Sequence, residues 1–124
     1  VDNHATRKVV SDHVLTLSDA LLISGGNDEY DGNVQIHDRR DGKDVTHPLT
    51  HLHPEIESPK DRNPAELGCG ELVLEGATQF LAVNFTIAAL MLNAYTLYCK
   101  NGKVPYEEIY FNLRTGNVRP ASYT

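Results

Sequence analysis

Three polar side chains near the start of the sequence have a spacing that could do chemistry. Asp2 and Asn3 directly precede a segment with helical periodicity, and Arg7 follows one helical turn after Asn3. A carboxylate at a turn that leads into a helix could hold magnesium against phosphate groups, because magnesium prefers oxygen ligands. Asp2 or Asn3 would also serve as a helix N-cap, since a short side-chain oxygen accepts hydrogen bonds from free backbone N–H groups. The spacing alone leaves both roles open.

A thiol in a glycine-flanked position is the second candidate. Cys69 lies between Gly68 and Gly70, after a proline-containing segment and shortly before a long apolar stretch. Small neighbours leave the backbone free, and a nearby helix N-terminus would favour the thiolate, so Cys69 could act as a nucleophile. The alternative is a small buried hydrophobic side chain, because free cysteines are often simply buried. We expect Cys99 to lie in the core.

Residues 47–55, with the sequence HPLTHLHPE, form a third candidate set. They contain three imidazoles and one carboxylate, at His47, His51, His53 and Glu55. His51 and His53 would lie on the same side of an extended segment, a spacing found in metal sites. A metal hydrolase would also need a distant acidic ligand, which the sequence does not identify. Solvated histidines in a proline-rich loop are the other interpretation.

The first candidate set must be positioned by a helix and a strand. Apolar residues with a spacing close to i, i+4, i+5 predict a helix with polar residues on its other side. The apolar positions are Ala5, Val9, Val10, Val14 and Leu17, and the polar ones are Arg7, Lys8, Ser11 and Asp12. Residues 20–24, ALLIS, are a short continuous apolar run that ends at Gly25-Gly26, which predicts a strand buried on both faces.

Alternating residues further along predict more strands. Val34 and Ile36 alternate with polar residues, and Asp41-Gly42 supplies a two-residue turn into a second strand, so we expect a β-hairpin. Residues 47–68 hold four of the six prolines and predict a long loop. Closing strands are expected around Ile109 and Val118, joined by a turn at Thr115-Gly116.

A long apolar segment precedes these closing strands. We expect a helix from about residue 78 to residue 101, ended by Gly102. Residues 80–98 are long enough to span a membrane, but polar Asn84, Thr86, Asn93 and Thr96 are spread through them. A central, buried helix of a soluble protein is therefore the expected role, and a membrane association is not expected.

Composition narrows the classes of partner. The 124 residues carry a formal net charge of −6, and the basic residues occur singly or in pairs, so a nucleic-acid partner is not expected. Two cysteines cannot form a disulfide framework, which favours a cytoplasmic setting. The pattern of elements predicts an α/β chain with a mixed sheet, a β-hairpin and a long buried helix.

The sequence VDNHATRK resembles the Asp-Asn-x-x-x-Arg signature of the ThiF/MoeB/ubiquitin-activating (E1-like) adenylyltransferase superfamily. The order of the later features is also similar: a strand that ends at 24–26, a strand that begins at 32–34, a proline-rich crossover, a cysteine before a long helix, and a closing Phe-x-Leu-x-Thr-Gly strand at 111–116. The divergent bacterial ThiF-like branch is the most similar. The resemblance implies that residues 1–124 are the C-terminal half of a ThiF-type Rossmann-like adenylation domain.

The resemblance also implies an activity. Such enzymes use ATP and magnesium to adenylate the C-terminus of a ubiquitin-like or sulfur-carrier protein, and a cysteine can then accept the acyl group. Asp2 matches the catalytic, magnesium-associated position, Asn3 and Arg7 match the accompanying positions at the nucleotide site, and Cys69 matches the acceptor thiol. A homodimer is implied. A non-catalytic module that binds a ubiquitin-like protein is the alternative in another class.

The sequence departs from this family in two places. It has no Gly-x-Gly-x-x-Gly turn between a strand and a helix, so the nucleotide-binding N-terminal half is expected to be a missing part outside these residues. It also lacks paired Cys-x-x-Cys motifs, so no structural zinc is expected. By themselves, the 124 residues are expected to bind ATP poorly.

Overall fold

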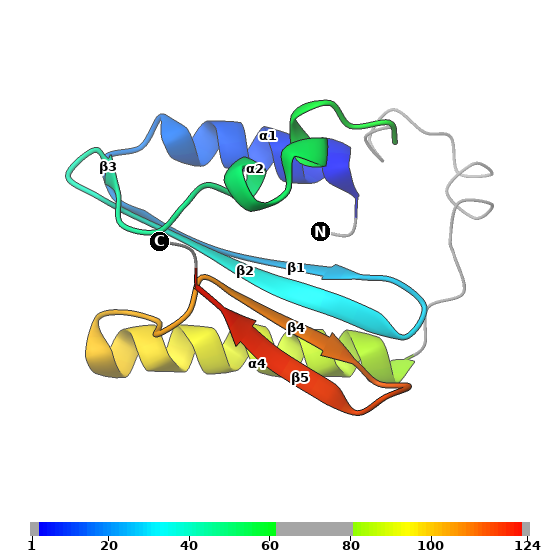
Figure 1. The fold of residues 1–124 in the computed structure, drawn as a ribbon. Helices are drawn as coiled ribbons and strands as arrows, with labels where there is room; N and C mark the ends of the chain where they lie inside the picture. Colours follow the sequence, from blue (N-terminus) through cyan, green and yellow to red (C-terminus); the bar gives the residue numbers. More distant parts are fainter. Residues whose placement is uncertain (1–2, 62–80, 123–124) are drawn as a thin grey trace.

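The computed structural model describes residues 3–61 and 81–122, which fold as one sheet with helices on both faces (Figure 1). Helix α4 (Leu81–Asn101) covers one face, and helix α1 (His4–Leu15) lies over the other together with α2 (Leu49–Leu52) and the 3₁₀ helix η1 (Pro54–Glu57). The chain is therefore mixed α/β, as the sequence predicted.

The sheet is open and antiparallel. Its order is β1 (Ala20–Asn27), β2 (Asp31–Arg40), β4 (Glu108–Asn112) and β5 (Asn117–Ala121), and the short β3 (Lys43–Asp44) pairs with the end of β2. Every pairing between these strands is antiparallel, whereas the sequence predicted a mixed sheet. The reason is connectivity, since short turns join β1 to β2, β2 to β3 and β4 to β5, and such turns require antiparallel neighbours.

Strict alternation along β2 and β4 gives the sheet two different faces. Apolar side chains point toward α4 and form the main core with residues of that helix. The buried members of this core are Val34, Ile36, Val83, Ile87, Ala94, Ile109 and Phe111. The residues between them on β2 and β4 are mostly polar and point to the opposite face. The core therefore lies between the sheet and α4.

Glycine lets α4 approach β1 closely. A Cβ atom on Gly25 would come within 2.4 Å of Cγ2 of Ile87 and within 2.9 Å of Sδ of Met91. Sequence reasoning treated Gly25-Gly26 as the end of the strand, but β1 continues through both glycines to Asn27. Most of its residues before Gly25 are only half-buried, so the predicted burial on both faces is wrong for that part of the strand.

Helix α1 begins where the cap signal predicted. Asn3 is the N-cap, and its Oδ1 accepts a hydrogen bond of 2.8 Å from the backbone N–H of Thr6. The predicted orientation is wrong for most of the helix, because Arg7 and Ser11 are buried and Val9 is 59 % exposed, whereas Val14 is buried as predicted. The reason is that α1 lies on the side of the sheet where β2 presents polar residues, so the helix turns polar residues inward.

Residues 47–61 are more ordered than the predicted long loop. They form α2 and η1, in which Leu49 and Ile56 are fully buried and fix the segment against the rest of the domain. Proline at the first position of η1 is compatible with a helical turn, because the missing N–H would have no partner there. The rest of the predicted loop, residues 62–68, lies outside the described residues.

The predicted turns are confirmed. Asp41 and Gly42, with φ values of 51° and 73°, join β2 to β3, and Gly116, with φ of 72°, lies in the turn between β4 and β5. Gly102, with φ of 69°, ends α4, and its N–H donates to the carbonyl of Tyr98.

The expectation of a central, buried α4 is wrong. The helix packs on the sheet through Val83, Ile87 and Ala94, but it has a second, exposed apolar side on which Phe85 and Leu92 are about two-thirds exposed. Among the described residues, α4 is the one helix long and apolar enough to cross a membrane. Part of the apolar character of α4 belongs to the side of the helix that packs on the sheet.

The two-faced sheet gives a stability prediction. Ile36→Ala should lower the free energy of unfolding by about 2–4 kcal/mol, because Ile36 is 2 % exposed in the core and its removal leaves a cavity. Val9→Ala, on the exposed side of α1, should change it by less than about 0.5 kcal/mol. Urea unfolding of both variants measures this difference, and equal effects would contradict the assigned core.

Candidate functional site

A cavity of about 400 Å³ opens on the polar face of the sheet. Its floor comes from β2, β4 and β5, and its walls come from the start of α1, the β1–β2 turn and His53. The polar or charged side chains that line it belong to His4, Arg7, Asn27, Asp28, Asp31, Asn33, His53, Tyr110, Asn112, Asn117 and Arg119. Amide groups and charges of both signs thus surround the space, which suits a polar ligand that can both donate and accept hydrogen bonds.

Strand register explains why the floor is polar. Tyr110 lies opposite Arg119 and Asn112 lies opposite Asn117 in the β4–β5 pair, so these four side chains share one face. Asn33 of β2 lies opposite Tyr110 on the other side of β4. Alternate residues of β4, Ile109 and Phe111, belong to the core against α4.

The best-organised part of the cavity is an ion pair with a buried carboxylate. Nε2 of His53 lies 2.7 Å from Oε1 of Glu108, whose side chain has no exposed surface. Nδ2 of Asn33 donates to the same oxygen at 2.6 Å, and the hydroxyl of Tyr110 lies 3.2 Å from Nε2 of His53. The other ring nitrogen of His53 lies 2.9 Å from Oε1 of Glu55. His53 therefore joins the η1 segment to β4.

The pair favours its charged form. Hydrogen bonding to Glu108 raises the pKa of His53 above its ordinary value of 6.5, although partial burial opposes this. Burial would raise the pKa of Glu108, but hydrogen bonds from His53, Asn33 and Tyr110 hold it below its ordinary value of 4.5. The contact with Glu108 therefore favours the imidazolium form of His53 at the edge of the cavity.

Arg7 reaches the cavity because Gly26 has no side chain. Arg7 is 6 % exposed, and a Cβ atom on Gly26 would lie 1.4 Å from Nη2 of Arg7. The guanidinium therefore occupies the place where another residue of β1 would have its side chain. The helix that begins at Asn3 thus delivers a buried cation to the cavity lining.

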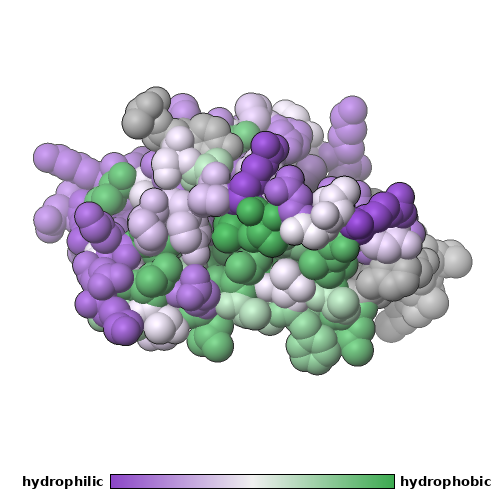
Figure 2. Space-filling view, turned by 60° about the horizontal axis from the view of Figure 1, so that its bottom comes forward, coloured by the Kyte–Doolittle hydropathy of each residue, from purple (hydrophilic) through white to green (hydrophobic). Residues whose placement is uncertain are grey.

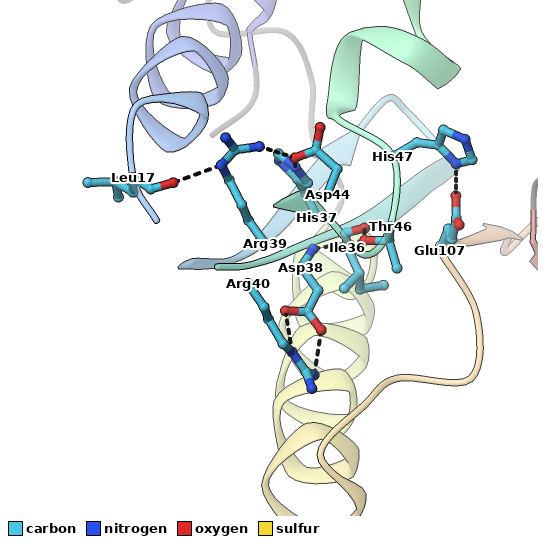
Figure 3. A network of polar contacts seen from close by, with 10 residues as sticks. All are labelled: Leu17, Ile36, His37, Asp38, Arg39, Arg40, Asp44, Thr46, His47 and Glu107. Atoms are coloured by element: carbon cyan, nitrogen blue, oxygen red, sulfur yellow. Dashed lines mark hydrogen bonds and ion pairs between the residues drawn. The ribbon is translucent and has the colours of Figure 1, made fainter. Parts of the chain in front are cut away.

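A second polar network lies at the other end of β2 (Figure 3). His37 is buried, its Nε2 lies 2.8 Å from Oδ1 of Asp44, and Arg39 donates to the same oxygen at 2.6 Å. Partial burial would raise the pKa of Asp44, but hydrogen bonds from His37 and Arg39 hold it below its usual value. Arg40 forms an ion pair of 2.6 Å with Asp38 on the neighbouring part of the strand.

Two histidines of the 47–55 segment pair with glutamates that are consecutive on the chain at the start of β4. Nδ1 of His47 lies 2.8 Å from Oε2 of Glu107 (Figure 3). Glu107 is the residue before Glu108, which pairs with His53. His51 stacks on His47, with the ring centroids 4.1 Å apart. Among residues 3–61 and 81–122, no group of three metal-ligating side chains comes together, so His47, His51 and His53 do not form a shared set there.

The predicted site residues have different outcomes. Asn3 caps α1, and Arg7 lines the cavity, so these two residues of the first candidate set lie at one end of one helix. Asp2 and Cys69 lie outside the described residues, as does the expected helix start at residue 78. Cys99 is exposed, not buried in the core as expected.

Sequence reasoning missed the side chains that make the floor. Asn33, Tyr110 and Asn112 of the floor, and Glu108 beside it, were not among the candidate site residues. A signal was present, since these outward residues are mostly amides, an acid and a tyrosine, whereas a plain solvated face would be richer in lysine. The alternating pattern does not predict that β2 pairs with β4, because about seventy residues separate the two strands in the chain.

Comparisons with known proteins give no match: no family model, no curated protein and no solved structure matches this chain.

The charged pair predicts how His53 titrates. Glu108→Gln should move the pKa of His53 back toward or below 6.5, because the carboxylate that favours the imidazolium is removed while burial remains. The variant should also lose about 2 kcal/mol of stability near pH 6. Glu107→Gln, at the neighbouring position, is the matched control and should leave the His53 titration unchanged. NMR titration of the His53 ring measures both.

The pair also sets the pH dependence of stability. His53 contributes fully below 6.5 and loses its contribution as the pH rises through its raised folded-state pKa. Glu108 contributes above 4.5 and loses its contribution as the pH falls through its lowered pKa. The pair should therefore stabilise the fold most between these values, and an unchanged pH profile in Glu108→Gln would contradict this.

Proposed function

We propose that this chain is part of an E1-like adenylating enzyme of the ThiF type, and that it contributes the carboxylate side of the ATP site. The observation that carries the proposal is the arrangement of the Asp-Asn-x-x-x-Arg element. Asn3 caps α1, and Arg7, one turn further along the same helix, lies buried against Gly26 and lines a polar cavity. Asp2 directly precedes the capping residue in the sequence.

In this proposal, the residues from Asp2 to Arg7 would form one side of a magnesium–ATP site. Asp2 would hold magnesium through a carboxylate oxygen, and Arg7 would place positive charge near the phosphate groups. Bound magnesium would offset the negative charge that develops as pyrophosphate leaves. Asn3 would fix the direction of α1, because its cap hydrogen bond sets where the helix begins. The glycine-rich phosphate turn is absent from the sequence, so residues beyond these 124 would hold most of the nucleotide.

In this proposal, the nucleotide-binding half of the domain would join the sheet along β1. β1 pairs only with β2 among the described strands, so its other edge carries backbone groups without a strand partner there. In a Rossmann-like domain, parallel strands of the nucleotide-binding half would extend the sheet at this edge. The antiparallel sheet would then be the C-terminal half of a mixed sheet, which is the arrangement that the resemblance implies.

Cys69 would accept the activated acyl group. It follows the segment that His47 and His53 fix to β4, so the start of the crossover has a defined position in the domain. The thiolate would attack the acyl adenylate of a ubiquitin-like or sulfur-carrier protein, a new bond would form to sulfur, and AMP would leave with the electron pair of the broken bond.

Substitutions at the two proposed reaction residues test these roles separately. In the complete enzyme, Asp2→Ala should abolish ATP–pyrophosphate exchange, because the magnesium ligand is lost. Cys69→Ala should keep the exchange but remove any thioester or persulfide adduct seen by mass spectrometry. Full turnover in both variants would overturn the assignment. Carrier binding without any AMP transfer by the wild-type enzyme would instead support a non-catalytic binding module.

The proposed role of Arg7 has its own test. Gly26→Ala should displace the guanidinium from its place on β1 while the fold survives, because the clashing atoms are the far end of a flexible side chain. ATP–pyrophosphate exchange should fall at least about tenfold, equivalent to about 1.4 kcal/mol. Arg7→Lys should give a similar loss, because a lysine keeps the charge but not the planar fork. Unchanged exchange in both variants would show that Arg7 has no role at the nucleotide.

A further inference from the structure

The cavity on the polar face of the sheet carries opposite charges at two of its corners. Figure 2 shows apolar residues gathered on the side of the molecule that carries α4 in Figure 1, whereas the cavity opens on the opposite face of the sheet. Arg119 of β5 and Asp31 of β2 both line this cavity and are exposed. Within residues 3–61 and 81–122, neither side chain takes part in a hydrogen bond or an ion pair. Both charges are therefore available to a ligand.

Strand register fixes how far apart these two charges lie. Asp31 lies opposite Asn112, Asn112 lies opposite Asn117, and Arg119 is two residues further along β5. Neighbouring strands are about 4.8 Å apart and two residues advance a strand by about 6.8 Å, so the Cα atoms of Asp31 and Arg119 are about 12 Å apart across the floor. The two side chains are therefore too far apart to pair with each other directly, and a small ligand could bridge them.

The corner around Arg119 suits a carboxylate. A guanidinium group presents a planar fork of N–H donors that binds a carboxylate through two parallel hydrogen bonds. Arg119 lies opposite Tyr110, whose hydroxyl lies 3.2 Å from Nε2 of His53. Both ring nitrogens of His53 already contact carboxylates, those of Glu108 and Glu55, so the donors for a ligand at this corner come from Arg119.

The opposite corner suits an ammonium group. Asp31 begins β2, and Asp28 lies beside it across the β1–β2 turn, where the N–H of Asp28 donates to the carbonyl of Asp31 at 2.9 Å. Both carboxylates line the cavity. An ammonium group carries three N–H donors and a positive charge, so it could be shared between these two acceptors. The cavity therefore offers separate places for a positive and a negative group.

Amide side chains lie between the two corners. Oδ1 of Asn112 accepts hydrogen bonds from the N–H groups of Arg114 and Thr115, at 3.0 and 3.1 Å, so its Nδ2 is the atom that it can offer to a ligand. Asn117, opposite Asn112, also lines the cavity and has a donor and an acceptor on its amide. A peptide group likewise has one N–H and one carbonyl, so it would pair with these amides. A hydrocarbon chain in the same place would leave them without partners.

The separation of the charges selects the length of the ligand. Two extended residues span about 7 Å. A hydrogen bond of about 2.9 Å at each end brings the total to about 13 Å, close to the separation of Asp31 and Arg119. A cavity of about 400 Å³ has room for two small residues.

We propose that this cavity binds a dipeptide with both termini free, with its ammonium group at Asp28 and Asp31 and its carboxylate at Arg119. The inference goes beyond the proposed adenylation and does not rest on it, because it uses neither Asp2 nor Arg7. The C-terminus of a carrier protein would present a carboxylate without an ammonium group two residues away, so the two kinds of ligand can be distinguished by experiment.

Calorimetric titration of the full chain with capped dipeptides tests the class of ligand. L-alanyl-L-alanine should bind, and both N-acetyl-L-alanyl-L-alanine and L-alanyl-L-alanine amide should bind at least about tenfold more weakly, because each lacks one charged group. The compound 6-aminohexanoate has both charges but no peptide group, and it should also bind more weakly. Equal binding of the free and the N-acetylated dipeptide would show a site for a carboxylate alone and overturn the proposal. No binding of L-alanyl-L-alanine at millimolar concentration would also overturn it.

Two substitutions test the orientation of the dipeptide. Arg119→Gln should remove the preference for a free carboxylate over the amide and keep the preference for a free ammonium group over the acetylated one. Asp31→Asn should have the opposite effect. Both side chains are exposed, so the circular dichroism spectrum should not change.

Matched controls remove the same charges elsewhere. Arg114→Gln changes a guanidinium that packs on the ring of Tyr30, and Asp41→Asn changes a carboxylate in the turn at the other end of β2. Neither residue lines this cavity, so both variants should keep both preferences of the wild type. If Arg119→Gln and Asp31→Asn keep them as well, the two charges do not contact the dipeptide and the proposal is wrong.

Discussion

A carboxylate with no exposed surface constrains the whole of this domain. Glu108 lies at the start of β4 on the polar face of the sheet, and burying its charge is costly unless partners surround it. His53, directly before η1, and Asn33 of β2 supply those partners, so the contact joins three segments that are distant in the chain. Meeting that one requirement fixes the 47–57 segment over the sheet and places the imidazole of His53 at the cavity edge.

One face of the sheet forms the core with α4, and the other face forms the floor of the cavity. The alternation of β2 and β4 sends Val34, Ile36, Ile109 and Phe111 into the core with α4, and the same alternation sends amides and charges to the cavity floor. Glycines matter on both faces, because Gly25 admits α4 and Gly26 admits the guanidinium of Arg7. The helix that closes the core is apolar on its outer side as well, where Phe85 and Leu92 are about two-thirds exposed.

Local features were predictable from the sequence, and long-range ones were not. The Asn3 cap, the Asp41-Gly42 turn and the Gly102 helix end depend on a few neighbouring residues, and all three are confirmed. The orientation of α1, the exposed side of α4 and the His53–Glu108 pair depend on which strands become neighbours, and local periodicity carries no such information. The histidines of the 47–55 segment illustrate the difference. Their spacing suggested a metal site, whereas His47 pairs with Glu107 and His53 pairs with Glu108, in each case more than fifty residues away.

We propose that the element from Asp2 to Arg7, the cavity that Arg7 lines and the segment that leads to Cys69 belong to a carrier-activating enzyme. Carrier-dependent ATP–pyrophosphate exchange by the complete wild-type protein tests this most directly. The account predicts exchange that needs magnesium and a carrier with a free C-terminal carboxylate, together with weak ATP binding by residues 1–124 alone in a calorimetric titration. Tight magnesium–ATP binding by these 124 residues, or a carrier complex that never transfers AMP, would contradict it.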